Sequence, residues 1–69
     1  MVIHTDVFHL DDAIDYYKMK NFGTRPYIFM NEDTMKGLGY INAFTRVFEY
    51  DGCRVFEDVK LDTCEVELR

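Results

Sequence analysis

The chain has 69 residues, which is enough for one small domain but leaves little room for a deep catalytic cleft. Hydrophobic residues make up 48% of the sequence, which excludes an intrinsically disordered segment. The formal net charge of −5 argues against nucleic acid as a partner, because phosphate binding needs a basic patch. We therefore expect a single domain over residues 1–69.

The N-terminal segment carries the histidine-containing cluster of the chain. Met1 to His4 could form a short strand. The spacing of His4, Asp6 and His9 could bind a transition metal, but it does not place two histidines on one face of a helix. We interpret these side chains as surface polar residues at a fraying chain end, and we expect no metal and no other cofactor. The segment also lacks the charged start and long apolar run of a signal peptide.

Residues 11–22 are predicted to form a helix. Asp11 is the candidate N-cap, and Gly23 can supply the left-handed residue that ends the helix. The acidic residues of the first turns could hold calcium or act as acid and base, but a helix N-terminus favours such charges in any case. An apolar stripe with helical spacing, which should cover a sheet, consists of Leu10, Ala13, Ile14 and Tyr17.

Apolar side chains that fall outside this stripe predict a contact surface. Tyr16 lies about 100° round the helix from Tyr17, and the next apolar residues also leave the stripe. Tyrosine and methionine are enriched at the cores of protein interfaces. We therefore predict that this side of the helix and the adjoining loop bind a partner protein or a second copy of the chain. The predicted contact residues are Tyr16, Met19, Phe22 and Arg25.

A second strand and a second, shorter helix should follow. Residues 27–30 form a short, bulky apolar run, which is typical of a strand that is buried on both faces. Asn31 is then a suitable N-cap for the short helix. In that helix Met35 and Leu38 should face inward, and Gly39 should end it.

The clearest local signal is Asp51-Gly52, which lies between two alternating segments, residues 44–50 and 53–59. Two-residue Asp-Gly loops favour the type I′ turn of a β-hairpin. The resulting register pairs opposite charges, which a slipped register would not do. The expected facing pairs are Tyr50–Cys53, Phe48–Val55, Val47–Phe56, Glu49–Arg54 and Arg46–Glu57.

The last predicted strand runs from Cys64 to Leu68, with Cys64, Val66 and Leu68 on its buried face. We interpret Cys53 and Cys64 as free buried thiols in a reducing cytosol, with a disulfide as the alternative. Together the elements predict an α+β fold. It has a small mixed, mostly antiparallel sheet, one long and one short helix on one face, a C-terminal β-hairpin and a final strand.

The segment from Pro26 to Leu38 resembles a sequence motif, a strand followed by a short helix, of the major capsid proteins of tailed bacteriophages. The segments from Gly52 to Asp58 and from Glu65 to Arg69 follow in the order of that family's later strands. A complete capsid subunit of the family is several times longer, and its long spine helix and extended arm are not found here. The resemblance implies a role in a shell or an assembly through protein contacts, without catalytic residues.

These observations predict a non-enzymatic structural or protein-interaction domain, since no nucleophile motif or phosphate loop is present. The alternative is a small ligand-binding or regulatory module with a cleft between the sheet and the first helix. No stretch approaches the roughly 20 apolar residues that span a membrane. We expect the chain in the cytoplasm, or in a virion if the capsid resemblance holds.

Overall fold

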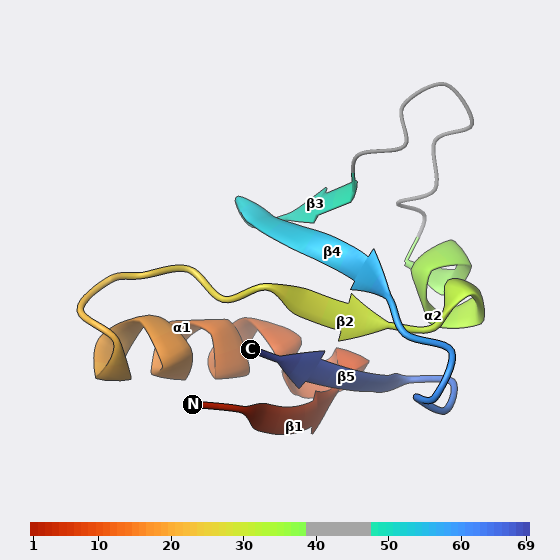
Figure 1. Ribbon diagram of the computed structural model, residues 1–69, viewed down its shortest axis with the longest axis horizontal. Coiled ribbons are helices and arrows are strands. Elements are labelled where there is room, and N and C mark those ends of the chain that lie inside the picture. Colours follow the sequence, from red (N-terminus) through yellow and green to blue (C-terminus); the bar gives the residue numbers. More distant parts are fainter. Residues whose placement is uncertain (39–47) are drawn as a thin grey trace.

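The computed structural model describes residues 1–38 and 48–69 of the chain. Its five strands form one sheet in the order β1-β5-β2-β4-β3. In this sheet β2 and β4 pair in parallel, whereas the other neighbouring strands pair antiparallel (Figure 1). The predicted α+β fold with a mixed, mostly antiparallel sheet is therefore confirmed. The elements are β1 (Ile3–Asp6), the 3-10 turn η1 (Val7–His9), α1 (Leu10–Lys20), β2 (Ile28–Met30), α2 (Glu32–Gly37), β3 (Phe48–Tyr50), β4 (Cys53–Glu57) and β5 (Glu65–Leu68).

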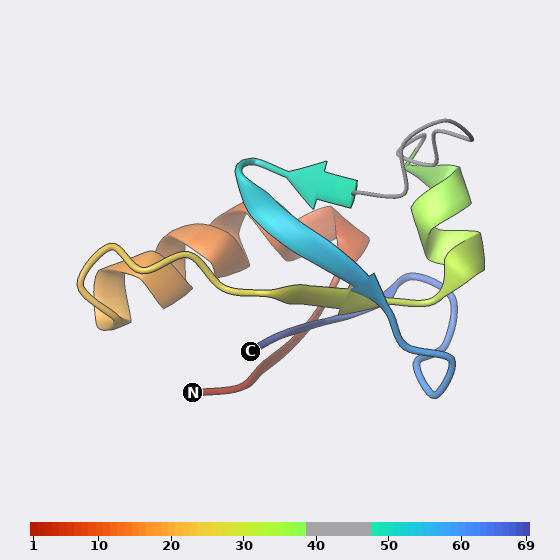
Figure 2. The same ribbon diagram turned by 45° about the horizontal axis from the view of Figure 1, so that its top comes forward.

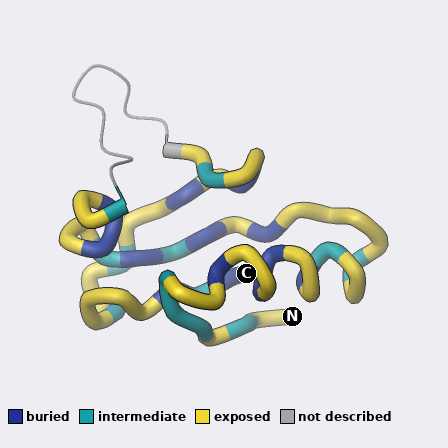
Figure 3. The backbone as a smooth tube through the Cα atoms, turned by 180° about the vertical axis from the view of Figure 1, so that it is seen from behind, coloured by how far each residue is buried: buried dark blue, intermediate teal, exposed yellow. Residues whose placement is uncertain are grey.

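The helix α1 lies across one face of the sheet, as Figures 1 and 3 show from opposite sides. All four residues of the predicted apolar stripe are buried there, so the helical phase read from the sequence is confirmed. They pack into one core with the inward side chains of three strands and one residue of α2. The core consists of Leu10, Ala13, Ile14, Tyr17, Ile28, Met30, Met35, Cys53, Val55, Val66 and Leu68.

The ends of α1 differ from the prediction. The helix begins at Leu10, and Asp11 does not cap it, because Asp11 lies in the first turn and accepts a hydrogen bond from the Tyr50 hydroxyl. The helix ends at Lys20 rather than at residue 22. Gly23 is left-handed, with φ of 84°, and its N–H donates to the Lys18 carbonyl at 2.7 Å. The first left-handed residue after the helix is Phe22, with φ of 55°, so Gly23 does not supply the residue that ends α1; its N–H satisfies a carbonyl of the last turn instead.

The N-terminal segment is an ordered edge strand, and the expectation of a fraying end is wrong. Ile3 pairs with Leu68, and Asp6 pairs with Glu65, so β1 is held along its length by β5. The two chain ends lie close together as a result (Figure 2). The Asp6 carboxylate then caps η1 by accepting the N–H groups of Phe8, at 2.9 Å, and His9, at 3.1 Å.

The strand β2 is buried on one face only, which corrects the prediction of a strand buried on both. Ile28 and Met30 point into the core, whereas Phe29 is half-buried and Tyr27, just before the strand, is 55% exposed. The reason is that α1 covers a single face, and no other described helix lies on the opposite one (Figure 1). A bulky apolar run therefore does not by itself require two covering layers.

The short helix α2 begins as expected. The Asn31 side chain accepts the N–H of Thr34 at 2.7 Å, which satisfies one of the free donors of the first turn. Met35 is buried in the core and Leu38 is half-buried against it. The predicted end of this helix at Gly39 lies outside the described residues.

The predicted hairpin is confirmed in its described part. Asp51 and Gly52 have φ of 51° and 74°, the two positive values of a type I′ turn. The three predicted pairs nearest the turn are present, namely Phe48–Val55, Glu49–Arg54 and Tyr50–Cys53. The pairs that involve residues 46 and 47, and the start of the strand predicted from residue 44, lie outside the described residues.

The two cysteines have different environments. Cys53 is buried and free, as predicted, whereas Cys64 is free and exposed. Cys64 does not belong to β5 but precedes it in a left-handed conformation with φ of 74°. The Thr34 hydroxyl accepts its N–H at 2.9 Å, and its carbonyl accepts the N–H of Val7 at 3.1 Å. These two contacts from distant segments hold Cys64 in the turn, which sequence alternation alone could not show.

Candidate functional site

The predicted contact surface lies on the outer side of α1 and on the turn after it. Tyr16 is 46% exposed and Met19 is 69% exposed, whereas Phe22 is fully exposed. Tyr16 and Met19 point away from the buried stripe, and Phe22 lies in the turn after the helix, next to the C-cap residue Asn21. The structure therefore presents three large apolar side chains where the sequence predicted them, within one helical turn and the adjoining loop.

Phe22 has an unusual backbone for a bulky residue. Its φ of 55° lies in the left-handed region, where a side chain with a Cβ is strained and glycine or asparagine is favoured. Its ring is exposed to solvent, so burial does not compensate for that strain. Such a residue lowers the stability of the free chain, and strained residues of this kind gather at functional sites.

Charged side chains border this surface on α1. Asp12 and Asp15 are exposed on the side of the helix opposite the core, and neither makes an ion pair with a described residue. The Lys20 ammonium lies 5.7 Å from the centre of the Tyr16 ring. The outer side of α1 is thus apolar in its middle and mostly acidic toward its N-terminal end.

Arg25, the fourth predicted contact residue, packs against the hairpin turn. A Cβ atom placed on Gly52 would lie 3.0 Å from Arg25 Nε. The side chain is exposed, but its described contact is with the turn rather than with the apolar side of α1. Arg25 therefore links the loop after α1 to the β3–β4 hairpin.

The two histidines of the predicted cluster contact different carboxylates, so they do not come together. His4 Nδ1 lies 3.4 Å from a Glu67 oxygen, and His9 Nδ1 lies 2.9 Å from an Asp6 oxygen. The hydrogen bond from His9 is the largest cause that lowers the pKa of Asp6, and the Phe8 N–H adds to it. Within residues 1–38 and 48–69, no group of three metal-binding side chains comes close enough to hold an ion. The absence of a metal or cofactor stays a prediction.

The face of the sheet opposite α1, which we call the open face, carries an aromatic cluster that sequence reasoning missed. The Phe29 and Phe56 rings stack with centres 5.4 Å apart, and the Tyr27 ring meets Phe56 edge-on at 5.7 Å. Phe29 lies in β2, Tyr27 lies just before it, and Phe56 lies in β4, which is a neighbour of β2 in space but far from it in the sequence. Alternation within each strand indicates the outward residues, but only the pairing of β2 with β4 brings them together.

Arg69 covers part of this cluster. Its guanidinium carbon lies 3.9 Å from the centre of the Phe29 ring, and its nitrogens bond to Glu67 and, at 3.0 Å, to Asp58. The bond to Glu67 is the largest cause that raises the pKa of Arg69. The pKa of Asp58 is lowered, first by the N–H of Lys60 and then by Arg69. The arginine charge is therefore balanced within the chain.

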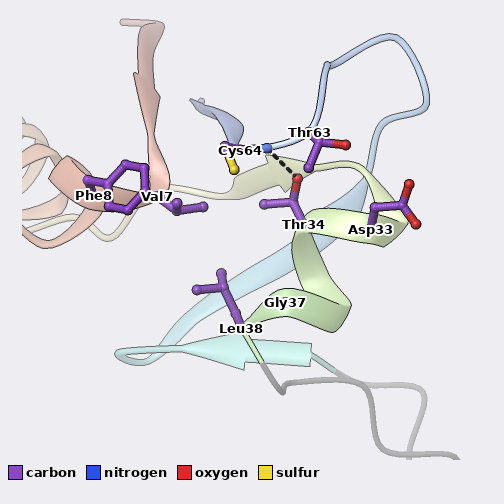
Figure 4. A pocket seen from close by; sticks show the side chains of 8 residues that line it. All are labelled: Val7, Phe8, Asp33, Thr34, Gly37, Leu38, Thr63 and Cys64. Atoms are coloured by element: carbon purple, nitrogen blue, oxygen red, sulfur yellow. Dashed lines mark hydrogen bonds between the residues drawn. The ribbon is translucent and has the colours of Figure 1, made fainter.

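A pocket of about 290 Å3 opens between η1, α2 and the turn before β5 (Figure 4). Its wall is mostly apolar, and Cys64 points toward it. The Thr34 hydroxyl on this wall already donates to Asn31 and accepts from the Cys64 N–H. The pocket therefore lies beside η1 and α2, and not in the predicted cleft between the sheet and the first helix, where core side chains pack. Its lining residues are Val7, Phe8, Asp33, Thr34, Gly37, Leu38, Thr63 and Cys64.

The comparisons with known proteins give no match to a family model, a curated protein or a solved structure. The resemblance to phage capsid proteins therefore stays a hypothesis that rests on the short motifs alone. In the described part of the chain, neither helix has the length and apolar character that a membrane span needs.

Proposed function

We propose that this chain is a non-enzymatic protein-interaction domain that binds its partner through the outer side of α1 and Phe22. The observation that carries the proposal is Phe22 itself, which combines a fully exposed ring with a left-handed backbone. Glycine would adopt this conformation without strain, so folding does not explain a phenylalanine at this position. Contact with a partner would explain it, because burial of the ring would remove from water the apolar surface that the monomer leaves exposed.

The chemistry of the surface defines the kind of partner. Met19 and Tyr16 supply apolar area, and the carboxylates of Asp12 and Asp15 lie beside it. The whole chain carries a net charge of −5, which attracts cationic molecules over a distance. The matching partner is a segment with both apolar and basic side chains, such as an amphipathic helix. A role in assembly, as the capsid resemblance implies, would use the same kind of contact.

A synthetic amphipathic peptide with leucines on one face and arginines beside them tests this proposal. Titrated into isotope-labelled chain, it should shift the backbone NMR signals of residues 12–22 most strongly. Replacing Tyr16 or Phe22 by serine should weaken binding and leave the melting temperature nearly unchanged, since both side chains are exposed.

Two controls make the experiment specific. Phe8→Ser removes an equally large exposed ring, 83% accessible, from η1 and should leave peptide binding intact. A peptide with the same leucines but glutamates in place of the arginines should bind more weakly. The proposal fails if the two peptides bind alike, if the shifts lie elsewhere, or if the Tyr16 and Phe22 variants unfold.

A small-ligand module is the second candidate function, and the pocket beside Cys64 favours it. The volume of about 290 Å3 is at the lower end of the range of known ligand sites, roughly 300–1,000 Å3. We rank it second because Thr34, the buried polar residue of the wall, is already engaged in internal hydrogen bonds. An apolar ligand such as indole would reveal this function by shifting the signals of Val7, Phe8 and Leu38 instead.

A further inference from the structure

The pocket between η1, α2 and the turn before β5 brings an apolar wall and a thiol together (Figure 4). Val7, Phe8 and Leu38 supply apolar side chains to the wall. Cys64 is free and exposed, and its side chain points toward the pocket. The volume of about 290 Å3 gives room for about ten non-hydrogen atoms, at the roughly 30 Å3 that a water molecule occupies in the liquid. The wall and the thiol are separate observations, because such a wall favours an apolar molecule whether or not a thiol lies beside it.

The backbone of Cys64 is held at the pocket from two sides. The Thr34 hydroxyl accepts the Cys64 N–H at 2.9 Å, and the Cys64 carbonyl accepts the Val7 N–H at 3.1 Å. Thr34 and Val7 themselves line the pocket. The thiol is therefore kept beside any molecule that occupies the pocket, and this proximity raises the rate of a reaction between them.

The hydrogen bonds of the wall limit the chemistry that this thiol can do. Acyl transfer to a thiol develops an oxyanion, which free N–H donors have to stabilise. Exchange with a disulfide develops no oxyanion, and it needs only access for the attacking thiolate and a thiolate that can leave. The pocket therefore favours disulfide exchange over thioester formation. The lining residues whose N–H groups already donate within the chain are Val7, Phe8, Thr34 and Cys64.

Charge and polarity select the disulfide that fits. Asp33 brings a carboxylate to the wall, and the whole chain carries a net charge of −5. Both disfavour an anionic disulfide. We propose that Cys64 is a modification site for small neutral disulfides with apolar arms, one arm of which packs against the wall. The proposal rests on the pocket of the second candidate function and adds a covalent step to it.

The step is a thiol–disulfide exchange. The Cys64 thiolate attacks one sulfur of the disulfide, and a new S–S bond forms as the bond of the reagent breaks. The other half leaves as a thiolate and takes up the proton that the Cys64 thiol released. Cys64 is thereby oxidised to a mixed disulfide, and the leaving half is reduced to a thiol. A reducing thiol in excess reverses the step.

Two reagents of matched size, dipropyl disulfide and bis(hydroxyethyl) disulfide, test the proposal. They differ in having a methyl group or a hydroxyl at the end of each arm. The rate of adduct formation on the full chain, followed by mass spectrometry, is divided by the rate with N-acetylcysteine, which corrects for the reactivity of each reagent. The corrected rate should be roughly tenfold or more higher for dipropyl disulfide, since the wall favours a methyl group and a buried hydroxyl without a partner is costly. Peptide mapping should place the adduct on Cys64 and leave the buried Cys53 unmodified.

A pair of matched variants tests the role of the wall. Phe8→Ser removes an exposed ring from the lining and should reduce the preference for dipropyl disulfide severalfold. Phe22→Ser removes an exposed ring that does not line the pocket and should leave the preference unchanged. The unaltered chain in concentrated urea supplies a test without variants, because unfolding removes the pocket and the preference should disappear.

Equal corrected rates for the two reagents on the folded chain overturn the proposal. So does a preference that persists in urea, an adduct on Cys53, or a preference that Phe22→Ser abolishes and Phe8→Ser does not. If indole shifts the signals of the wall but the corrected rates are equal, the small-ligand function stands and only the covalent step is wrong. Peptide binding to α1 uses a different surface, so its outcome is separate from both.

Discussion

Replacement of Gly52 is the sharpest test of the hairpin that closes the sheet. Gly52 is the second residue of the type I′ turn and has φ of 74°. A Cβ atom there would also lie 3.0 Å from Nε and 3.3 Å from Cζ of Arg25. Both effects act against a side chain, but they differ in size. The Arg25 side chain is flexible and can move by a few tenths of an ångström, whereas the backbone conformation is imposed by the turn.

The backbone effect should therefore dominate. A residue with a Cβ in the left-handed region costs about 1–2 kcal/mol, so Gly52→Ala should lower the free energy of unfolding by about that amount. Gly52→Val should cost more, because a β-branched side chain resists positive φ more strongly. For a domain of this size each kcal/mol corresponds to about 4–8 °C in melting temperature. Both variants should thus melt several degrees below the parent chain.

Thermal and urea unfolding followed by circular dichroism measure these changes. Gly37→Ala is the matched control, because Gly37 lies in α2 without positive φ and nothing lies within 4 Å of an added Cβ. That variant should be as stable as the parent or more stable, by up to about 1 kcal/mol. Repeating Gly52→Ala in an Arg25→Ala background isolates the steric contribution. Equal effects at Gly37 and Gly52, or an unchanged melting temperature for Gly52→Val, would refute the reasoning.

Two further predictions concern the thiols and the carboxylates. Cys64 is exposed and should react with Ellman's reagent in the folded chain. Cys53 should react only after unfolding, because burial raises the pKa of its thiol and shields it from the reagent. Equal reaction rates of the two thiols would contradict the assigned burial. The folded-state pKa values of Asp6 and Asp58 are lowered, so their contribution to stability is present above their ordinary pKa near 4 and is lost as the pH falls through the lowered values. Melting temperatures measured between neutral and strongly acidic pH should therefore drop less steeply in the Asp6→Asn, Asp58→Asn double variant, and an equally steep drop would remove these groups as the cause.

Local interactions determined the elements that the sequence could predict. The stripe from Leu10 to Tyr17 repeats with the period of a helix, and Asp51-Gly52 has the backbone preference of a type I′ turn. Asn31 can cap α2 because its partner, the N–H of Thr34, lies three residues away. In each case the interacting groups are near one another along the chain. The exposure of Tyr16 and Met19 follows from the same helical phase, which is why that part of the candidate site was predictable.

Pairing between distant segments decided the rest, and no local pattern encodes it. The insertion of β5 between β1 and β2 turned the N-terminal segment into an ordered edge strand. The Thr34 hydroxyl and the Val7 N–H fixed Cys64 in a left-handed turn, although alternation alone had placed it in a strand. The parallel pairing of β2 with β4 joined Phe29 to Phe56. A strand's sequence specifies which side chains share a face, but its neighbours and the number of covering layers depend on the free energy of the whole sheet.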